Sequence, residues 1–429
     1  MIEVIETKKG SWQDRLNTLL ERIRLVPQEV DGTVREIIQA VKGQGDAALF
    51  NYTTRFDGFD PEKTGIVICR EEIEDAFSRV DVEIAEALQQ AAERIEKFHL
   101  HQKEDSWITT EEDGIILGQK VTPIDRVGIY IPGGKNAFPS TVLMNVIPAK
   151  IAGVGEIIVV SPTPAGKVND TLLAAAYIAG VERIYRVGGA QAIAALAYGT
   201  QSIPRADKVV GPGNIYVAHA KRVLQGTIGI DSFAGPSEIL VIADENADIH
   251  MVTADLLSQA EHDPMASSML VTPCESLARA VVKRLEIEMQ RLPRKDVIAE
   301  SLGKHGACII TRDLDEAFTV SNCVAPEHLE LMVQDAYEHL GKVRNAGAIF
   351  LGYYSPEAMG DYIAGPNHTL PTGSTSRFSS PLGVYDFVKR SSLIGFSSDA
   401  AKAIGPLAVK IARAENLEAH ARSVETRLK

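Results

Sequence analysis

The sequence is poor in cysteine, and its four cysteines lie far apart. Cys69, Cys274, Cys308 and Cys323 include no CxxC pair. Their spacing excludes a cysteine-rich structural zinc motif and disfavours the disulfide framework of a small secreted protein. Each cysteine is better interpreted as a small core residue than as a nucleophile. Reduced thiols predict a cytoplasmic protein.

Long apolar runs and a surplus of basic residues are also absent. No stretch approaches the roughly 18 to 20 apolar residues needed to span a bilayer. The opening segment, MIEVIETKKGSWQDRL, has no apolar run followed by a cleavage site. The 44 Lys and Arg against 57 Asp and Glu give a net charge of −13. Because nucleic acids and anionic membranes attract a basic face, we expect neither as a partner.

The hydrophobic content is sufficient for well-packed cores, since 45% of the residues are hydrophobic. A chain of 429 residues is too long for one ordinary core, which predicts two or more domains. Over residues 1–115, apolar residues recur at spacings of three and four in VREIIQAVKGQGDAALFNYTTRF and IAEALQQAAERIEKFHL. This spacing predicts a mainly helical N-terminal region.

From Arg126 onwards, β-branched runs alternate with helical stretches. Over residues 116–236 the expected strands are RVGIYI, EIIVVSP, RIYRV and DKVVG. Over residues 237–385 they are EILVIAD, SSMLVTP, ACIITRD, LELMV and AIFLG, with QDAYEHLGKVRNAG as one intervening helix. This alternation predicts parallel sheets with crossover helices. We therefore expect an α/β fold of two doubly wound, Rossmann-like domains, followed over residues 386–429 by a tail that is helical from about Ser392.

Five glycine-rich turns fall at the ends of the expected strands: IPGGKNAFPS, VGGAQA, GPGN, FAGPSE and IAGPNHTLPTG. Glycine allows the backbone to approach a ligand closely. We therefore expect a ligand cleft between the two sheets, at the carboxyl ends of their strands. No GxGxxG motif follows a strand, so a dinucleotide would bind without the standard pyrophosphate loop.

Gln259 and His262 are the first candidates for a metal site. They lie three residues apart near the end of the expected helix DIHMVTADLLSQAEH, so their side chains share one face. An amide oxygen and an imidazole nitrogen together suit a divalent first-row metal. Taken alone the pair is a weak signal, because a Gln and a His at this spacing are common on helix surfaces.

Glu327 and His328 are the candidate bases. They follow Pro326 and precede the strand LELMV, and a carboxylate and an imidazole are suitable general bases. Adjacent residues of an extended chain point to opposite faces, so both serve one site only if the backbone turns there. Otherwise they form a charge pair at a strand edge.

The last candidates lie in a loop and in the tail. Asp361, in the Gly- and Pro-rich loop that also contains His368, either completes a metal site or caps a local turn; no partner is assigned to His368. Glu415 and His420 lie five residues apart, about 140° around a straight helix. Asn416 tolerates left-handed geometry and so allows a helix break that brings them together. Without that break they are solvated residues of a charged helix.

Read together, these segments resemble the histidinol dehydrogenase family. The resemblance runs from DRVGIYIPGGKNAFPSTVLMNVIPAKIAGV through VGGAQAIAALAYGT, DKVVGPGNIYVAHAKR, FAGPSEILVIAD, LLSQAEHDP, APEHLEL, NAGAIFLG and AGPNHTLPTGSTSRFSSPLGV to LEAHARSV. It covers essentially the whole chain after about residue 115. One departure is Asn416, where the family often has a glycine.

The resemblance implies a reaction and its cofactors. L-Histidinol would be oxidised to L-histidine through a bound histidinaldehyde, with reduction of two NAD, in the last step of histidine biosynthesis. One zinc ion (Zn²⁺) per subunit would orient the imidazole and amine of the substrate. Its ligands would be Gln259, His262, Asp361 and His420. The last ligand would come from the other chain of a homodimer whose subunits exchange C-terminal tails.

The resemblance also implies roles for the remaining candidates. Tyr130, Gln191 and Asn214 match positions that contact NAD. The substrate would be held by Ser237, His328, Glu415 and the four metal ligands. His328 would take the alcohol proton as hydride leaves, and Glu327 would activate water for the second oxidation.

Two alternatives remain at the level of sequence. A related zinc- and NAD-dependent dehydrogenase of a small polyol, such as sulfopropanediol, would have no imidazole to recognise, and Glu415 and His420 therefore favour histidinol. A non-catalytic α/β ligand-binding protein would have lost Glu327, His328 or a metal ligand, and none of these is missing.

Overall fold

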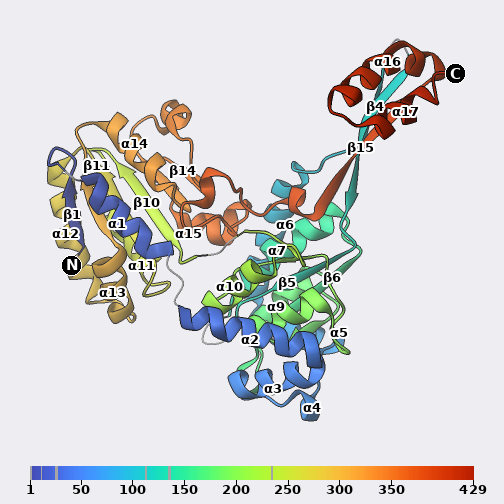
Figure 1. Ribbon diagram of the computed structural model, residues 1–429. Helices are drawn as coiled ribbons and strands as arrows, with labels where there is room; N and C mark the ends of the chain where they lie inside the picture. Colours follow the sequence, from blue (N-terminus) through green and yellow to red (C-terminus); the bar gives the residue numbers. More distant parts are fainter. Residues whose placement is uncertain (1, 11, 25–27, 112–113, 134–136, 233–234) are drawn as a thin grey trace.

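The computed structural model describes the chain except for residues 1, 11, 25–27, 112–113, 134–136 and 233–234. Figure 1 shows two lobes, each built around a sheet, and a narrow arm that projects from them and carries the C-terminus. The expected turn IPGGKNAFPS lies partly outside the described residues, at 134–136, and so does FAGPSE, at 233–234.

The first sheet has the strand order β2-β7-β6-β5-β8-β9. Its strands are β2 (Val67–Ile68), β5 (Arg126–Tyr130), β6 (Glu156–Ser161), β7 (Ile184–Arg186), β8 (Lys208–Val210) and β9 (Gly229–Ile230). All neighbours are parallel except β2 and β7. Successive residues of β5 enter different cores, Ile129 on one face and Tyr130 on the other. Both faces are therefore covered, as the alternation of side chains along a strand requires.

Helices pack on the two faces of the first sheet. One face carries α2 (Gln28–Gln44), α3 (Asp46–Asp57), α9 (Gly189–Tyr198) and α10 (Ile215–Leu224). The other carries α5 (Arg70–Arg79), α6 (Val82–Leu100), α7 (Pro139–Ala152) and α8 (Asp170–Ile178). The short α4 (Pro61–Thr64) follows α3.

The second sheet has the order β1-β12-β11-β10-β13-β14 and is parallel throughout. Its strands are β1 (Glu3–Glu6), β10 (Glu238–Ala243), β11 (Ser267–Thr272), β12 (Ala307–Ile310), β13 (His328–Met332) and β14 (Ala348–Leu351). Helices α11 (Ile249–Ala260), α12 (Glu275–Met289) and α13 (Lys295–His305) cover one face. Helices α1 (Trp12–Arg24) and α14 (Leu314–Val324) cover the other. Every residue of the central strand β10 is buried, as two covered faces require.

The two sheets share one winding pattern. In the first, the chain runs outward from β5 through β6 to β7 and then continues on the other side of β5 with β8 and β9. In the second, β10, β11 and β12 are followed by β13 and β14 on the other side of β10. This is the doubly wound arrangement, with a switch point beside the first strand of each unit. The predicted fold class is confirmed.

Strands occur in the N-terminal region, which was predicted to be mainly helical, and in the tail, which was predicted to be helical. The N-terminal region contains β1 and β2, which join the edges of the second and first sheets respectively. The tail is not helical from Ser392, because β15 (Val388–Phe396) pairs antiparallel with β4 (Ile115–Pro123) along its whole length. The stretch predicted as a helix over QDAYEHLGKVRNAG forms only a 3₁₀ segment, Ala336–Lys342.

The arm consists of β3 (Trp107–Thr110), β4 and β15, followed by α16 (Ser398–Ala414) and α17 (Glu418–Glu425). In Figure 1 its two helices lie at the upper right, away from both six-stranded sheets. Apolar side chains on the arm are exposed, including Ile394 at 71%, Leu407 at 58% and Ile411 at 61%. Among the described residues, no helix is long and apolar enough to cross a membrane.

Candidate functional site

The start of β13 brings the two candidate bases together. Glu327 lies just before the strand and His328 begins it, and both side chains are buried. The backbone N–H of Glu238, at the start of β10, donates to Glu327 Oε2 over 2.9 Å. The same carboxylate lies 3.7 Å from His328 Nδ1. The two adjacent side chains therefore share one site, as the turn at Pro326 allowed.

The hydrogen bonds of His328 determine which ring nitrogen is free. Its Nδ1 lies 2.9 Å from the backbone carbonyl oxygen of Glu238. A carbonyl only accepts, so Nδ1 carries the proton and the neutral ring keeps its lone pair on Nε2. Nε2 is buried and has no hydrogen-bond partner among the described residues. It lies 3.8 Å from Asp361 Oδ1 and 3.9 Å from Glu357 Oε1.

Three possible metal ligands converge in front of this nitrogen. His262, Glu357 and Asp361 each offer one ligand atom, and these atoms lie within 4.8 Å of one another. His262 follows the end of α11, and its backbone N–H donates to the carbonyl of Gln259. Asp361 lies in the π-helical turn Gly360–Ala364, directly after the short α15 (Glu357–Met359). Two carboxylates and an imidazole form a donor set that suits a divalent cation.

The predicted ligand Gln259 supplies an independent indication of a missing partner. Its side chain is fully buried, yet neither the oxygen nor the nitrogen of its amide has a hydrogen-bond partner in the part of the chain that the structure describes. Leaving both atoms unpaired is costly in a protein interior. A metal bound by the amide oxygen would remove part of that cost. The side chains present therefore fit a metal ion.

Carboxylates dominate the electrostatics of the site. Burial raises the pKa of Glu327 to about 8. Burial lowers the pKa of His328, but the nearby carboxylates of Glu327, Glu357 and Asp361 outweigh burial and raise it to about 10 while no cation balances their charge. A dication beside these carboxylates would lower the pKa of His328 again and favour the neutral ring that accepts a proton. Burial also opposes ionisation of Asp361, whose pKa is nevertheless held down at about 2 by His328 and His368. The site thus favours an added positive charge, which a dication would supply.

The other residues of the Asp361 loop are accounted for by structure. His368 Nδ1 lies 3.0 Å from the carbonyl oxygen of Asp361, and its Nε2 lies 3.3 Å from Thr141 Oγ1. Both ring nitrogens thus have partners, and His368 ties the loop to α7.

Ser237 lies just before β10, where its carbonyl accepts from Ser267 N–H. It therefore occupies the edge of the second sheet at which Glu327 and His328 lie.

The predicted NAD-contacting residues lie together on the other sheet. Tyr130 ends β5, and its hydroxyl accepts a hydrogen bond of 3.2 Å from Gly189 N–H in the first turn of α9. Gln191, in the same turn, is buried, and its Oε1 has no partner among the described residues. Asn214 caps α10, with its Oδ1 accepting from the N–H groups of Tyr216 and Val217. These residues fit a polar ligand at the carboxyl ends of the strands.

Glu415 and His420 are not brought to the site within one chain. Both are exposed on the arm, which Figure 1 shows projecting away from the second sheet. The predicted break between them is present, since Asn416 has φ 61° and separates α16 from α17.

Sequence reasoning missed several acidic residues that the structure places near the candidate site. Glu357 lies one turn before Asp361, a spacing that could have identified it. Glu330, in the middle of the apolar strand β13, is 1% exposed, and burial raises its pKa to about 9. A charged residue inside a buried strand is rare, so the sequence alone could have singled out Glu330. At the other sheet, burial raises the pKa of Asp57 to about 6, near Tyr130.

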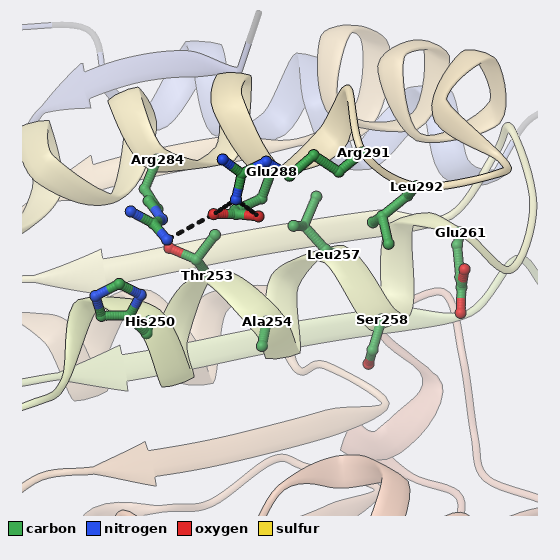
Figure 2. Close-up of a pocket in the computed structure, with 10 residues that line it drawn as sticks. All are labelled: His250, Thr253, Ala254, Leu257, Ser258, Glu261, Arg284, Glu288, Arg291 and Leu292. Atoms are coloured by element: carbon green, nitrogen blue, oxygen red, sulfur yellow. Dashed lines mark hydrogen bonds and ion pairs between the residues drawn. The ribbon is translucent and has the colours of Figure 1, made fainter.

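A separate pocket of about 540 Å³ lies between α11 and α12. Figure 2 shows Glu288 between Arg284 and Arg291 at its upper wall. Its lining residues are His250, Thr253, Ala254, Leu257, Ser258, Glu261, Arg284, Glu288, Arg291 and Leu292. None of them is a predicted site residue, so this pocket and the candidate site involve different side chains of α11.

The comparisons with known proteins agree with one another, and each covers nearly the whole chain. The sequence model of the histidinol dehydrogenase family matches residues 20–428. A histidinol dehydrogenase from Syntrophotalea carbinolica is 52% identical over 429 residues, with 100% of both chains covered. One from Geobacter sulfurreducens is 52% identical over 426 residues, with 99% of each chain covered. The crystal structure of histidinol dehydrogenase from Elizabethkingia anophelis gives a TM-score of 0.93 at 37% identity, covering 100% of this chain and 98% of that one.

Proposed function

The chain belongs to the histidinol dehydrogenase family, and from this premise we propose that it oxidises L-histidinol to L-histidine with zinc and two NAD. Family membership makes it an oxidoreductase of histidine biosynthesis that acts on a small molecule. The observation that supports the proposed chemistry best is the free Nε2 of His328, which faces the cluster of His262, Glu357 and Asp361.

We assign the metal to Gln259, His262 and Asp361, with His420 as the fourth ligand. When bound, zinc supplies a Lewis-acid centre that orients the imidazole and amine nitrogens of the substrate. The chain itself offers an unpaired buried amide, an imidazole and a carboxylate. Ser237 and Glu415 complete the proposed substrate contacts.

The first oxidation needs a base for the hydroxyl proton. As hydride leaves the substrate carbon for the nicotinamide, His328 Nε2 accepts the proton from the hydroxyl group. The carbonyl of Glu238 holds the opposite ring nitrogen, so the accepting lone pair is already oriented. The aldehyde remains bound, because releasing it would expose a reactive intermediate.

The second oxidation needs water, and we assign its activation to Glu327. Its Oε2 is held by Glu238 N–H, and its raised pKa of about 8 makes the ionised carboxylate a stronger base than an ordinary glutamate. Water loses a proton to Glu327 and adds to the aldehyde, and the hydrate then gives a second hydride to NAD. Tyr130, Gln191 and Asn214 would contact that NAD at the first sheet.

The stoichiometry tests this function. Purified protein with zinc should produce two NADH for each histidinol consumed, measured by absorbance against histidine formed. One NADH per histidinol, or no turnover, would contradict the proposal. Removing the metal with a chelator should abolish activity, and zinc should restore it. Full activity after verified metal removal would reject the metal site.

We further propose a homodimer in the cytoplasm, in which His420 of the partner subunit completes each site. The exposed apolar side chains of the arm and the exposed positions of Glu415 and His420 support it. Mixing His262→Ala chains with His420→Ala chains tests the arrangement. A heterodimer would then contain one site with both intact ligands, so activity should reappear on mixing after dissociation and reassembly. No recovery in a verified heterodimer would mean that His420 acts within its own chain.

A further inference from the structure

Lys221 is a buried cation that the proposed chemistry does not use. It lies on α10 with its side chain 2% exposed. Among the described residues it is the only lysine or arginine that is buried. Lysine is almost never fully buried unless it is paired, because burial removes the water that solvates its charge. The partners of Lys221 therefore indicate what its position provides.

Lys221 and Asp231 hold the two backbone polar groups of one residue, Gly211. Lys221 Nζ donates to the carbonyl oxygen of Gly211 over 2.9 Å. The backbone N–H of Gly211 donates to Asp231 Oδ2 over 2.7 Å. Lys221 Nζ also forms an ion pair with Asp231 Oδ1, and the side chain of Asp231 is 4% exposed. The three contacts close a ring in which a buried ion pair fixes both the N–H and the carbonyl of Gly211.

Gly211 lies between two of the residues proposed to contact NAD. It directly follows β8, and Val210 at the end of β8 pairs with Ile129 of β5. Gly211 therefore lies beside Tyr130, and a Cβ at Gly211 would lie 2.1 Å from the carbonyl oxygen of Tyr130. Asn214, three residues later, caps α10. The direction in which the chain leaves β8 thus determines where Asn214 lies relative to Tyr130.

The backbone of Gly211 lies beyond the regular hydrogen-bond ladder. The ladder between β8 and β9 ends with the pair Val209 and Ile230. Gly211 has φ 106°, which glycine adopts readily and other residues rarely. The close approach to Tyr130 requires a glycine, yet glycine has more conformational freedom than any other residue. Holding its N–H and its carbonyl from two sides restricts that freedom.

We propose that the buried pair of Lys221 and Asp231 is a positioning clamp that fixes the turn over residues 211–214 so that Tyr130 and Asn214 bind NAD. The proposal rests on the NAD site of the proposed function and deepens it. The clamp acts on the cofactor through the backbone of Gly211, so its two side chains are positioning residues. Fixing a site in its binding conformation reduces the entropy lost on binding, so the clamp should affect NAD affinity more than kcat.

The first variant removes one side of the clamp. Lys221→Met keeps a long side chain but provides no donor for the carbonyl of Gly211 and leaves Asp231 buried without a counter-charge. The dissociation constant of the full chain for NAD should rise about 10- to 100-fold, which corresponds to the loss of a hydrogen bond from a charged group. Isothermal titration calorimetry measures it. The KM for histidinol should change little, and unchanged NAD affinity in folded Lys221→Met overturns the clamp.

A double variant separates positioning from stability. Removing one partner of a buried ion pair is strongly destabilising, whereas replacing both by apolar side chains is often neutral. Lys221→Met should therefore lower the Tm, and adding Asp231→Val should restore part of it. The double variant still lacks both bonds to Gly211, so its dissociation constant for NAD should stay raised. Recovery of NAD affinity together with the Tm would mean that the pair only stabilises the fold, and would overturn the clamp.

Lys208→Met is the matched control. Lys208 begins the same strand, β8, at the opposite end, and its Nζ donates to the backbone carbonyl and to Oδ1 of Asp386, each over 2.8 Å. This variant should lower the Tm and leave NAD affinity unchanged. An equal rise of the dissociation constant in Lys208→Met and Lys221→Met overturns the clamp.

If Lys221→Met fails to fold, the double variant alone decides, and NAD affinity equal to that of the unchanged protein overturns the proposal. Failure of the unchanged protein to bind NAD has a different meaning, since it rejects the cofactor of the proposed function and the clamp with it.

Discussion

The two six-stranded sheets wind in the same order, yet their candidate sites lie at opposite ends of the strands. On the first sheet, Tyr130 ends β5 and Asn214 follows β8, so the NAD candidates lie at the carboxyl edge. On the second, Glu327 and His328 lie at the start of β13, beside Glu238 at the start of β10. The expectation of a cleft at the carboxyl ends is therefore wrong for the catalytic candidates.

Helix dipoles explain why the edges suit different ligands. Crossover helices start at the carboxyl edge of a parallel sheet, where N–H groups and about half a positive charge per helix favour a phosphate-bearing cofactor. The same helices end at the amino edge, where the partial charge is negative. Helix α11 ends there at Ala260, with Gln259 in its last turn and His262 just beyond it. An edge of negative potential suits a dication and a cationic substrate.

The carboxyl edge of the second sheet is also physically closed. Asp244, just after β10, accepts hydrogen bonds from Gln334 N–H after β13 and from the Tyr353 hydroxyl. The equivalent switch point of the first sheet has Gly211, where a Cβ would lie 2.1 Å from the carbonyl oxygen of Tyr130. A carboxylate bridges the strands at the second edge, whereas at the first edge the backbone of Gly211 closely approaches that of Tyr130.

Removing the base at the amino edge should have the largest effect. His328→Ala should lower kcat for histidinol oxidation by about 10²- to 10⁴-fold, the usual contribution of a general base. The KM for NAD should change little, because the cofactor candidates lie on the other sheet. Steady-state NADH kinetics check both values. A defect confined to the KM for NAD would contradict the division between the edges.

Replacing Glu327 should separate the two oxidations. Below pH 8 most of this carboxyl is protonated and cannot accept a proton from water, because burial raises its pKa to about 8. Aldehyde oxidation should therefore rise with pH through about 8 and level off above it. Glu327→Gln should slow this step, abolish the rise and leave alcohol oxidation largely intact. Stopped-flow NADH traces from histidinaldehyde and from histidinol measure the steps separately.

A substitution at the carboxyl edge of the first sheet should affect the cofactor alone. Gly211 has φ 106°, and Gly211→Ala would force the turn away from Tyr130. Strain of this kind costs about 1–3 kcal/mol, so the KM for NAD should rise about tenfold or more. Zinc content, measured by mass spectrometry, should match that of the unchanged protein. Loss of zinc would show that the two edges are coupled.

The smallest functional effect is expected at the closed edge. Asp244→Asn weakens hydrogen bonds to Gln334 N–H and Tyr353 and should cost about 1–3 kcal/mol of stability. Calorimetric unfolding should show a lower Tm, while kcat and both KM values stay unchanged. A large loss of kcat would mean that this edge takes part in catalysis.

Local patterns in the sequence predicted the central strands of the two six-stranded sheets but missed β1, β2 and β15. Alternating strands and helices such as EIIVVSP and NDTLLAAAYIAG carry their own signal, and Asn416 predicted the helix break correctly. Strand β15 was missed because it is stabilised by pairing with β4, more than 250 residues earlier in the chain. Propensity within a short window contains no information about such a partner.

The residues of the candidate site were also only partly predictable from local sequence patterns. Gln259, His262 and Asp361 were identified through a family resemblance, since each is unremarkable alone. Glu330 was missed although it is a charged residue in an otherwise apolar strand. Its hydrogen bond from Glu357 N–H, which links β13 to the Asp361 turn, exists only in the folded chain. The choice of edge was missed because a general rule for cofactor sites was applied to a site for cations.

Strand β1 has a consequence for the order in which the protein folds. It pairs with β12, so Glu3 lies opposite Ala307. During synthesis, β1 must wait for a partner that emerges about 300 residues later, after all six strands of the first sheet. Contacts this distant in sequence slow folding. The first sheet can therefore form while β1 is still unpaired, whereas the second sheet is completed only after β12, β13 and β14 have been made.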